Sequence, residues 1–155
     1  MIKSEDLRIG DFVKVSSDHS MIPQGTICEV VGISYQRILT KKKRFAILLP
    51  LDRKEDEEAH GIWLDNIEGI PITKEFLIKN GFKETKHRRD GRGYEWCTYE
   101  WYTYENKNSR VIVEYYPKTK DFSTFVGGEE LCYITHVHEL QNILSVFKEN
   151  IEITV

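Results

Sequence analysis

The stretch THVHELQNIL, residues 135–144, marks the point at which this chain changes from one secondary-structure pattern to another. The segment before it, ELCYIT (130–135), is a short β-prone run. From Val137 onward the apolar residues recur at intervals of three and four, which is the spacing of one face of an α-helix. These residues are Val137, Leu140, Leu144, Phe147 and Ile151. The stretch therefore predicts a strand that leads directly into a closing helix.

The same stretch places His136 and His138 two residues apart, with Glu139 beside them. On an extended strand these imidazoles would share a face and could bind a metal. Because the helical pattern begins at Val137, we expect His138 and Glu139 in the first helical turn, where successive side chains diverge by about 100°. No H-E-x-x-H motif supplies further ligands. We therefore interpret the histidines as structural or solvent-facing, with a metal-dependent hydrolase at His136 and His138 as an alternative.

Upstream of this stretch, the second half of the chain predicts a helix followed by an antiparallel meander. In GIPITKEFLIKNGF (69–82), Thr73 can cap the start of a helix and Gly81 can adopt the left-handed conformation that ends it. Four β-prone runs follow, separated by turn residues. They cover residues 94–105, 110–116, 122–126 and 130–135.

The first half of the chain predicts a small β-barrel. Its β-prone runs are short, lack helical periodicity and are separated by turn signals. They cover residues 11–15, 26–33, 44–51 and 61–67. The overall prediction is an α+β protein in two parts. Residues 1–72 form an SH3-like barrel, and residues 73–155 form an antiparallel sheet flanked by two helices.

Composition excludes several classes of function. No apolar run approaches the roughly 20 residues that span a bilayer, and Met1–Asp6 has no apolar signal core, so we expect a cytoplasmic protein with no membrane partner. The sequence has no nucleophile elbow and no phosphate-binding loop. We therefore predict no catalytic residue, metal or cofactor. Cys28, Cys97 and Cys132 form no C-x-x-C pair and are interpreted as small buried hydrophobic residues.

Two basic segments suggest nucleic-acid binding as an alternative. KKKR (41–44) is expected in a connection of the barrel, and KHRRDGR (86–92) is expected between the two parts of the chain. The net charge is −3, whereas proteins that bind nucleic-acid backbone usually have a positive excess, so this function is not favoured. Its candidate contacts are Lys41, Lys42, Lys43, Arg44, Arg88, Arg89 and Arg92.

The aromatic run YEWCTYEWYTYE (94–105) is the most distinctive feature of the sequence. As a strand it places aromatic rings on both faces. If the helices cover one face, the rings on the other face are left partly exposed, and such patches often bind partners. The alternative is that a second layer, such as the N-terminal barrel or a second copy of the chain, covers these rings. The candidate partner surface comprises Trp96, Tyr99, Trp101 and Tyr102.

Two resemblances add to this interpretation. LRIGDFVKV (7–15) and PQGTICEVVGI (23–33) resemble the opening of small SH3-like barrels of the KOW type, which bind RNA, DNA, peptides or proteins. The segments Ile70–Thr73, Gly81–Phe82 and Val137–Asn142 resemble a group of uncharacterised small proteins of Bacteroides-type bacteria and their phages or mobile elements. That resemblance implies a fold and a source, and no catalytic residue.

Together these observations predict a non-enzymatic accessory or adaptor protein, associated with a phage or mobile element. We expect it to bind a protein partner or a second copy of itself through the aromatic surface. Nucleic-acid binding through the basic segments is the alternative, followed by the hydrolase.

Overall fold

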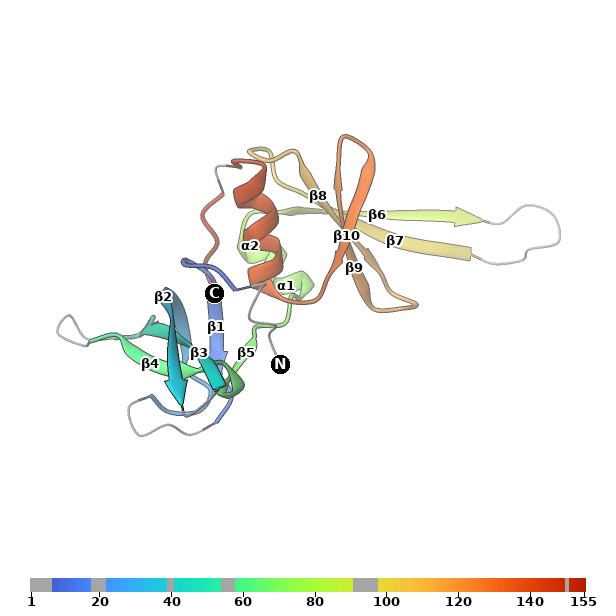
Figure 1. Cartoon of the computed structure of the whole chain (residues 1–155). Coiled ribbons are helices and arrows are strands. Elements are labelled where there is room, and N and C mark those ends of the chain that lie inside the picture. The colour runs from blue at the N-terminus through green and yellow to red at the C-terminus, as the bar shows by residue number, and fades with distance from the viewer. Residues whose placement is uncertain (1–6, 18–21, 39–40, 54–57, 91–97, 150) are drawn as a thin grey trace. The chain divides into compact units, whose positions relative to one another are not determined.

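The computed structural model describes residues 7–17, 22–38, 41–53, 58–90, 98–149 and 151–155. The chain divides into two compact units (Figure 1). Unit 1 comprises Met1–Pro71, His136–Asn142 and Val155, and unit 2 comprises Ile72–Thr135 and Ile143–Thr154. The last helix therefore contributes its first part to unit 1 and its second part to unit 2.

Unit 1 contains a five-stranded antiparallel sheet in the order β4-β3-β2-β1-β5. Alternate residues of its strands, such as Val13, Val30 and Ile62, are fully buried and form the core of this unit. A 3₁₀ turn, η1 (Leu64–Asn66), joins β4 to β5. The strands are β1 (Phe12–Val15), β2 (Ile27–Ile38), β3 (Lys41–Pro50), β4 (His60–Trp63) and β5 (Ile67–Gly69).

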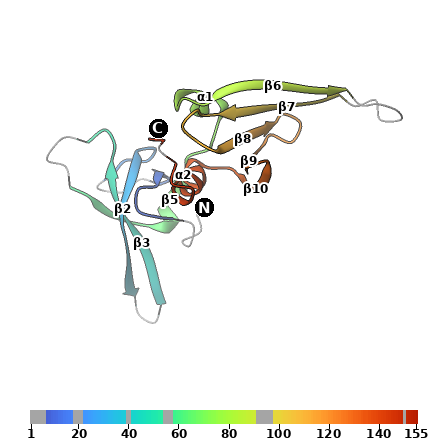
Figure 2. The same cartoon turned by 90° about the horizontal axis from the view of Figure 1, so that it is seen from above.

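The long hairpin of β2 and β3 corrects one prediction. KKKR (41–44) was expected in a connection between strands, but it begins β3, with Ile38 paired to Lys41. In Figure 2 the paired ends of β2 and β3 extend past the short strands of the same sheet. Backbone hydrogen bonds hold this ladder together, so its outer residues need no apolar alternation to remain a strand.

Unit 2 contains a second five-stranded sheet, a meander in the order β10-β9-β8-β7-β6. The strands are β6 (Lys83–Asp90), β7 (Thr98–Glu105), β8 (Val111–Tyr116), β9 (Asp121–Val126) and β10 (Glu129–Ile134). The α+β class is confirmed, but the prediction of four strands was wrong. Residues 86–90, expected between the two parts of the chain, belong to the edge strand β6. This strand pairs with β7 along its whole length, although its sequence KETKHRRD has no apolar face.

The first helix, α1 (Lys74–Lys79), is bounded by the residues that the sequence predicted. The Thr73 hydroxyl accepts a hydrogen bond of 3.1 Å from the Phe76 N–H. Gly81 has a φ of 78°, and the N–H of buried Phe82 donates to the Leu77 carbonyl at 3.0 Å. Both caps are confirmed.

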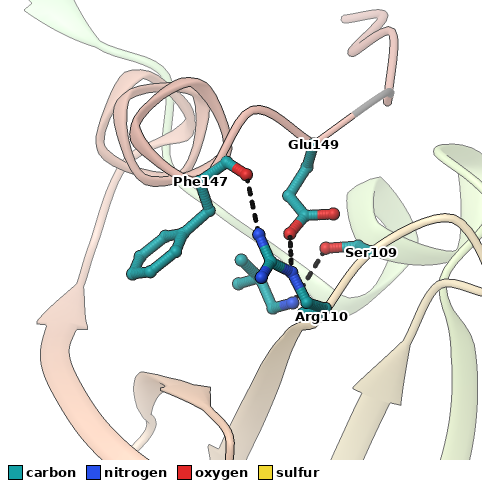
Figure 3. A network of polar contacts seen from close by, with 5 residues as sticks. Ser109, Arg110, Phe147 and Glu149 are labelled. Carbon is teal, nitrogen blue, oxygen red and sulfur yellow. Dashed lines mark hydrogen bonds and ion pairs between the residues drawn. The ribbon is translucent and has the colours of Figure 1, made fainter.

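The last helix, α2 (Val137–Val146), begins where the pattern predicted but ends before Phe147 and Ile151, which the pattern had included. Lys148 has a φ of 53°, which stops the helix, and the Glu149 N–H then donates to the Leu144 carbonyl at 2.9 Å. Arg110 fastens this end, because its guanidinium donates to the Phe147 carbonyl and to the Glu149 carboxylate, each at 3.1 Å (Figure 3).

The two faces of the unit 2 sheet differ in exposure. One face, here called the covered face, presents Tyr104, Val113, Phe122 and Ile134, all buried. Helix α1 lies against this face, since the Lys74 ammonium lies over the Tyr102 and Tyr115 rings at 3.7 and 4.5 Å from their centroids. The opposite face presents the candidate site.

Candidate binding site on the aromatic face

Four aromatic side chains lie on the face of the unit 2 sheet opposite the covered face. We call them the aromatic face: Tyr99 and Trp101 from β7, Tyr116 from β8 and Tyr133 from β10. They line a hollow of about 330 Å³. Tyr99 is 46% exposed and Tyr133 is 65% exposed. The four aromatic side chains therefore border an open hollow on one face of the sheet.

The Trp101 ring contacts a side chain of the neighbouring strand β6, its register partner on the same face of the sheet. The His87 ring stacks on it with centroids 5.0 Å apart and planes inclined by 15°. The His87 Nε2 atom lies 2.8 Å from the hydroxyl of Thr103, which is buried. The contact with Thr103 holds the imidazole in place. The stacked imidazole in turn holds the Trp101 ring in one orientation.

The Tyr116 hydroxyl is also held in place. It donates a short hydrogen bond to the Glu114 carboxylate. Burial raises the pKa of Tyr116 above its ordinary value, and the hydrogen bond and negative charge of Glu114, with smaller effects from Glu130 and Tyr133, raise this pKa further. The phenol therefore remains neutral, and two carboxylates lie close to this wall of the hollow.

Charged groups of both signs surround the hollow. Asp121 is part of its lining, and Lys118 lies in the turn between β8 and β9. The Lys118 ammonium sits 4.8 Å from the centroid of the Tyr99 ring, within the range of a cation–π contact. The aromatic face thus already interacts with an alkylammonium group.

The structure divides the aromatic surface that the sequence predicted. Tyr99 and Trp101 lie on the aromatic face, but Tyr102 lies on the covered face beneath Lys74, because successive strand residues point to opposite sides. Tyr102 therefore shares no face with Tyr99 and Trp101, and Trp96 lies outside the described residues. Sequence reasoning missed Tyr116 and Tyr133, although each belongs to a strand that it had predicted.

A second hollow, of about 750 Å³, lies in unit 2 around the turn between β7 and β8. Its lining is dominated by polar and long charged side chains, including Lys83, Glu105, Lys107 and Arg110. It has no aromatic wall. The aromatic face is therefore the better candidate for a binding site.

The candidate basic residues that the structure describes are divided between the two units. Lys43 and Arg44 belong to unit 1, where Lys43 lies 3.8 Å from the Asp65 carboxylate and Arg44 stacks over Tyr35 at 4.9 Å.

Arg88 and Arg89 belong to unit 2 and occupy successive positions of β6, opposite Glu100 and Tyr99 respectively. They therefore point to opposite faces of the sheet. Arg92 and the side chains of Lys41 and Lys42 lie outside the described residues.

The histidines of the opening stretch are closer together than the helical wheel predicts. The rings of His136 and His138 stack with centroids 5.5 Å apart, because His136 precedes the helix and His138 lies in its first turn. The Glu139 carboxylate accepts a hydrogen bond of 2.9 Å from the His136 N–H, as in a capping box. Among the described residues, no group of three His, Cys, Asp or Glu side chains could hold a metal ion.

The cysteines differ in exposure. Cys28 is fully buried, as predicted. Cys132 is exposed, so the prediction of a buried residue was wrong there, because β10 is an edge strand whose residues Glu129–Tyr133 are all exposed. Cys97 lies outside the described residues.

Comparison with known protein families, with characterised proteins and with solved structures gave no match. Over the part of the chain that the structure describes, neither helix has the length and apolar character needed to cross a bilayer.

Proposed function

We propose that this chain is a non-enzymatic accessory or adaptor protein that binds a protein partner through the aromatic face. The observation that carries this proposal is the hollow formed by Tyr99, Trp101, Tyr116 and Tyr133 on a sheet whose other face is buried. Tyr and Trp side chains contribute a large share of binding energy at interfaces, because they bury much area at low entropic cost.

Unit 1 supports the same proposal at the level of fold. We infer an SH3-like barrel for this unit, and the observation that supports the inference is the strand order β4-β3-β2-β1-β5 with a 3₁₀ turn between β4 and β5. Barrels of this type serve as binding modules. Together with the resemblance of Ile70–Thr73 and Val137–Asn142 to proteins of phages and mobile elements, this supports a cytoplasmic adaptor of such an element.

The test compares the wild-type chain with a Tyr99→Ala/Tyr133→Ala double variant in affinity capture from the source cells. Both rings are exposed, so the double variant should fold. A matched control is Tyr35→Ala, which removes a tyrosine of unit 1 that is 56% exposed.

The captured protein is then purified, and its affinity for each variant is measured. We expect the double variant to lose at least 10-fold in affinity, corresponding to about 1.4 kcal/mol, while the control binds normally. Equal binding by all three proteins would contradict the proposal.

A second candidate function, binding of single-stranded nucleic acid, is supported by one observation in unit 1. On the β2–β3 hairpin, the Arg44 guanidinium lies 4.9 Å from the centroid of the exposed Tyr35 ring. Cations beside exposed rings suit phosphate contact and base stacking. Fluorescence anisotropy with a labelled oligonucleotide at low salt tests it, and an Arg44→Ala/Tyr35→Ala variant should lose any binding.

A further inference from the structure

We propose that the hollow of the aromatic face accepts an alkylammonium group, the side chain of a lysine or methylated lysine presented by the protein partner. This inference rests on the proposed function and specifies the chemistry of the partner. Three features of the described residues support it: the aromatic walls, the neighbouring carboxylates and the position of Lys118.

The walls of the hollow favour a cation. An aromatic ring carries negative charge on its faces, so several rings around one space attract a positive group and repel an anion. Tyr99, Trp101, Tyr116 and Tyr133 supply four such rings. The hydroxyl of Tyr116 is already committed to the Glu114 carboxylate, which leaves its ring as the surface offered to a ligand.

The charges near the hollow also favour a cation over an anion. Asp121 lines it, and the carboxylates of Glu114 and Glu130 both act on the Tyr116 phenol. Glu100 also lines the hollow, but the Lys86 ammonium lies 3.2 Å from its carboxylate. Against the other three carboxylates stand Lys118 and Arg89, the latter paired in register with Tyr99. An entering ammonium group would therefore meet an excess of negative charge, and a carboxylate or phosphate would be repelled.

Lys118 shows where the cation would sit. Its ammonium already lies over Tyr99, yet its side chain is exposed and comes from a turn, so it can move into water at little cost. A partner lysine would take its place over the ring. At about 330 Å³ the hollow is near the lower limit of ligand sites, which suits one side chain better than a large ligand.

The experiment uses three small probes and the full chain. The probes are Nα-acetyl-lysine methylamide, its Nζ-trimethyl form and its Nζ-acetyl form. Binding is followed by the amide chemical shifts of Tyr99, Trp101 and Tyr116. We expect the two cationic probes to bind in the millimolar range, and the neutral acetyl form to bind at least 10-fold more weakly. Equal binding of the acetyl form would overturn the inference, and so would the absence of any shift.

Lys118→Ala provides a sharper test, because it removes the internal competitor without touching a ring. A cation–π contact at an exposed site is worth enough to change affinity about two- to fivefold. The variant should therefore bind the trimethyl probe about two- to fivefold more tightly. Weaker or unchanged binding would overturn the inference. Tyr99→Ala/Tyr133→Ala should abolish binding of the probes, and Tyr35→Ala should preserve it.

Competition separates this inference from the proposed function. If the purified partner requires Tyr99 and Tyr133 but the trimethyl probe does not displace it, the proposed function stands and the cation inference fails. If the probe binds as expected but the partner binds the double variant normally, the proposed function fails and the inference holds only for the hollow itself.

Discussion

The side chain of Asn80 connects two parts of unit 2, and its replacement should have a large effect on stability. Its side-chain N–H groups donate to the carbonyls of Phe76 and Thr154, both at 2.9 Å. Its side-chain oxygen accepts from the Thr154 N–H at 2.7 Å and from the Thr154 hydroxyl at 3.3 Å. The side chain thus ties the C-terminal segment to the end of α1, and Asn80 itself is only 8% exposed.

The size of the expected loss in the free energy of unfolding follows from these contacts. An intramolecular hydrogen bond contributes about 1 kcal/mol net. The two contacts with the backbone of Thr154 are the ones that Asn80→Ala loses outright, and the Phe76 carbonyl loses one of its two donors, since the Asn80 N–H also donates to it. Thr154 is exposed and its freed groups can bind water. We therefore expect a loss of about 2–3 kcal/mol in the free energy of unfolding.

Urea denaturation followed by circular dichroism measures this loss, and hydrogen exchange at the Thr154 amide locates it. The matched control is Asn108→Ala, at an exposed turn position, which should change stability by less than about 0.5 kcal/mol. Asn80→Asp should be at least as damaging as Asn80→Ala, because a carboxylate would face two carbonyl oxygens. If Asn80→Ala behaves like the control, the attachment of the C-terminal segment through Asn80 is refuted.

Three further predictions concern unit 1 and the end of α2. Burial raises the pKa of the Asp11 carboxyl from 3.8 to about 6, although the Arg8 N–H bonded to it and the Arg8 charge lower it. Between these two values the folded state holds a proton that the unfolded state has released, so the free energy of unfolding should fall as the pH rises from about 4 to 6. Thermal unfolding across this range should show the fall in the wild type but not in Asp11→Asn, and identical profiles would contradict it. Gly69→Ala should destabilise unit 1 by about 1–3 kcal/mol, because the added Cβ would lie 2.4 Å from the His136 ring; an unchanged denaturation midpoint would show that the ring moves freely. Lys148→Gly should stabilise the chain by about 1 kcal/mol, because it removes a side chain from a left-handed position, and a lower melting temperature would count against this account of the helix end.

Local signals in the sequence identified the elements whose stability depends on neighbouring residues. Thr73 and Gly81 mark the two ends of α1 because capping involves residues only three or four positions apart. Val137 and Leu144 mark the buried side of α2, because residues spaced three or four apart lie on one face of a helix. Lys148 was missed, because a left-handed conformation at a lysine has no signal in the sequence.

Long-range pairing explains the predictions that failed. The strand β6 (Lys83–Asp90) has no apolar alternation, and it is extended because β7 supplies hydrogen-bond partners along its whole length. Cys132 is exposed because β10 is an edge strand of the sheet. Neither the identity of an edge strand nor the partner of a polar strand can be read from nearby residues.

The sequence by itself determined the α+β class, both helices, the positions of most strands and the alternation that separates Trp101 from Tyr102. Only the tertiary structure decided that Tyr99 and Trp101 would share a hollow with Tyr116 and Tyr133. The physical reason is that periodicity assigns a side chain to one of two faces, whereas the register and order of the strands determine which distant side chains meet there.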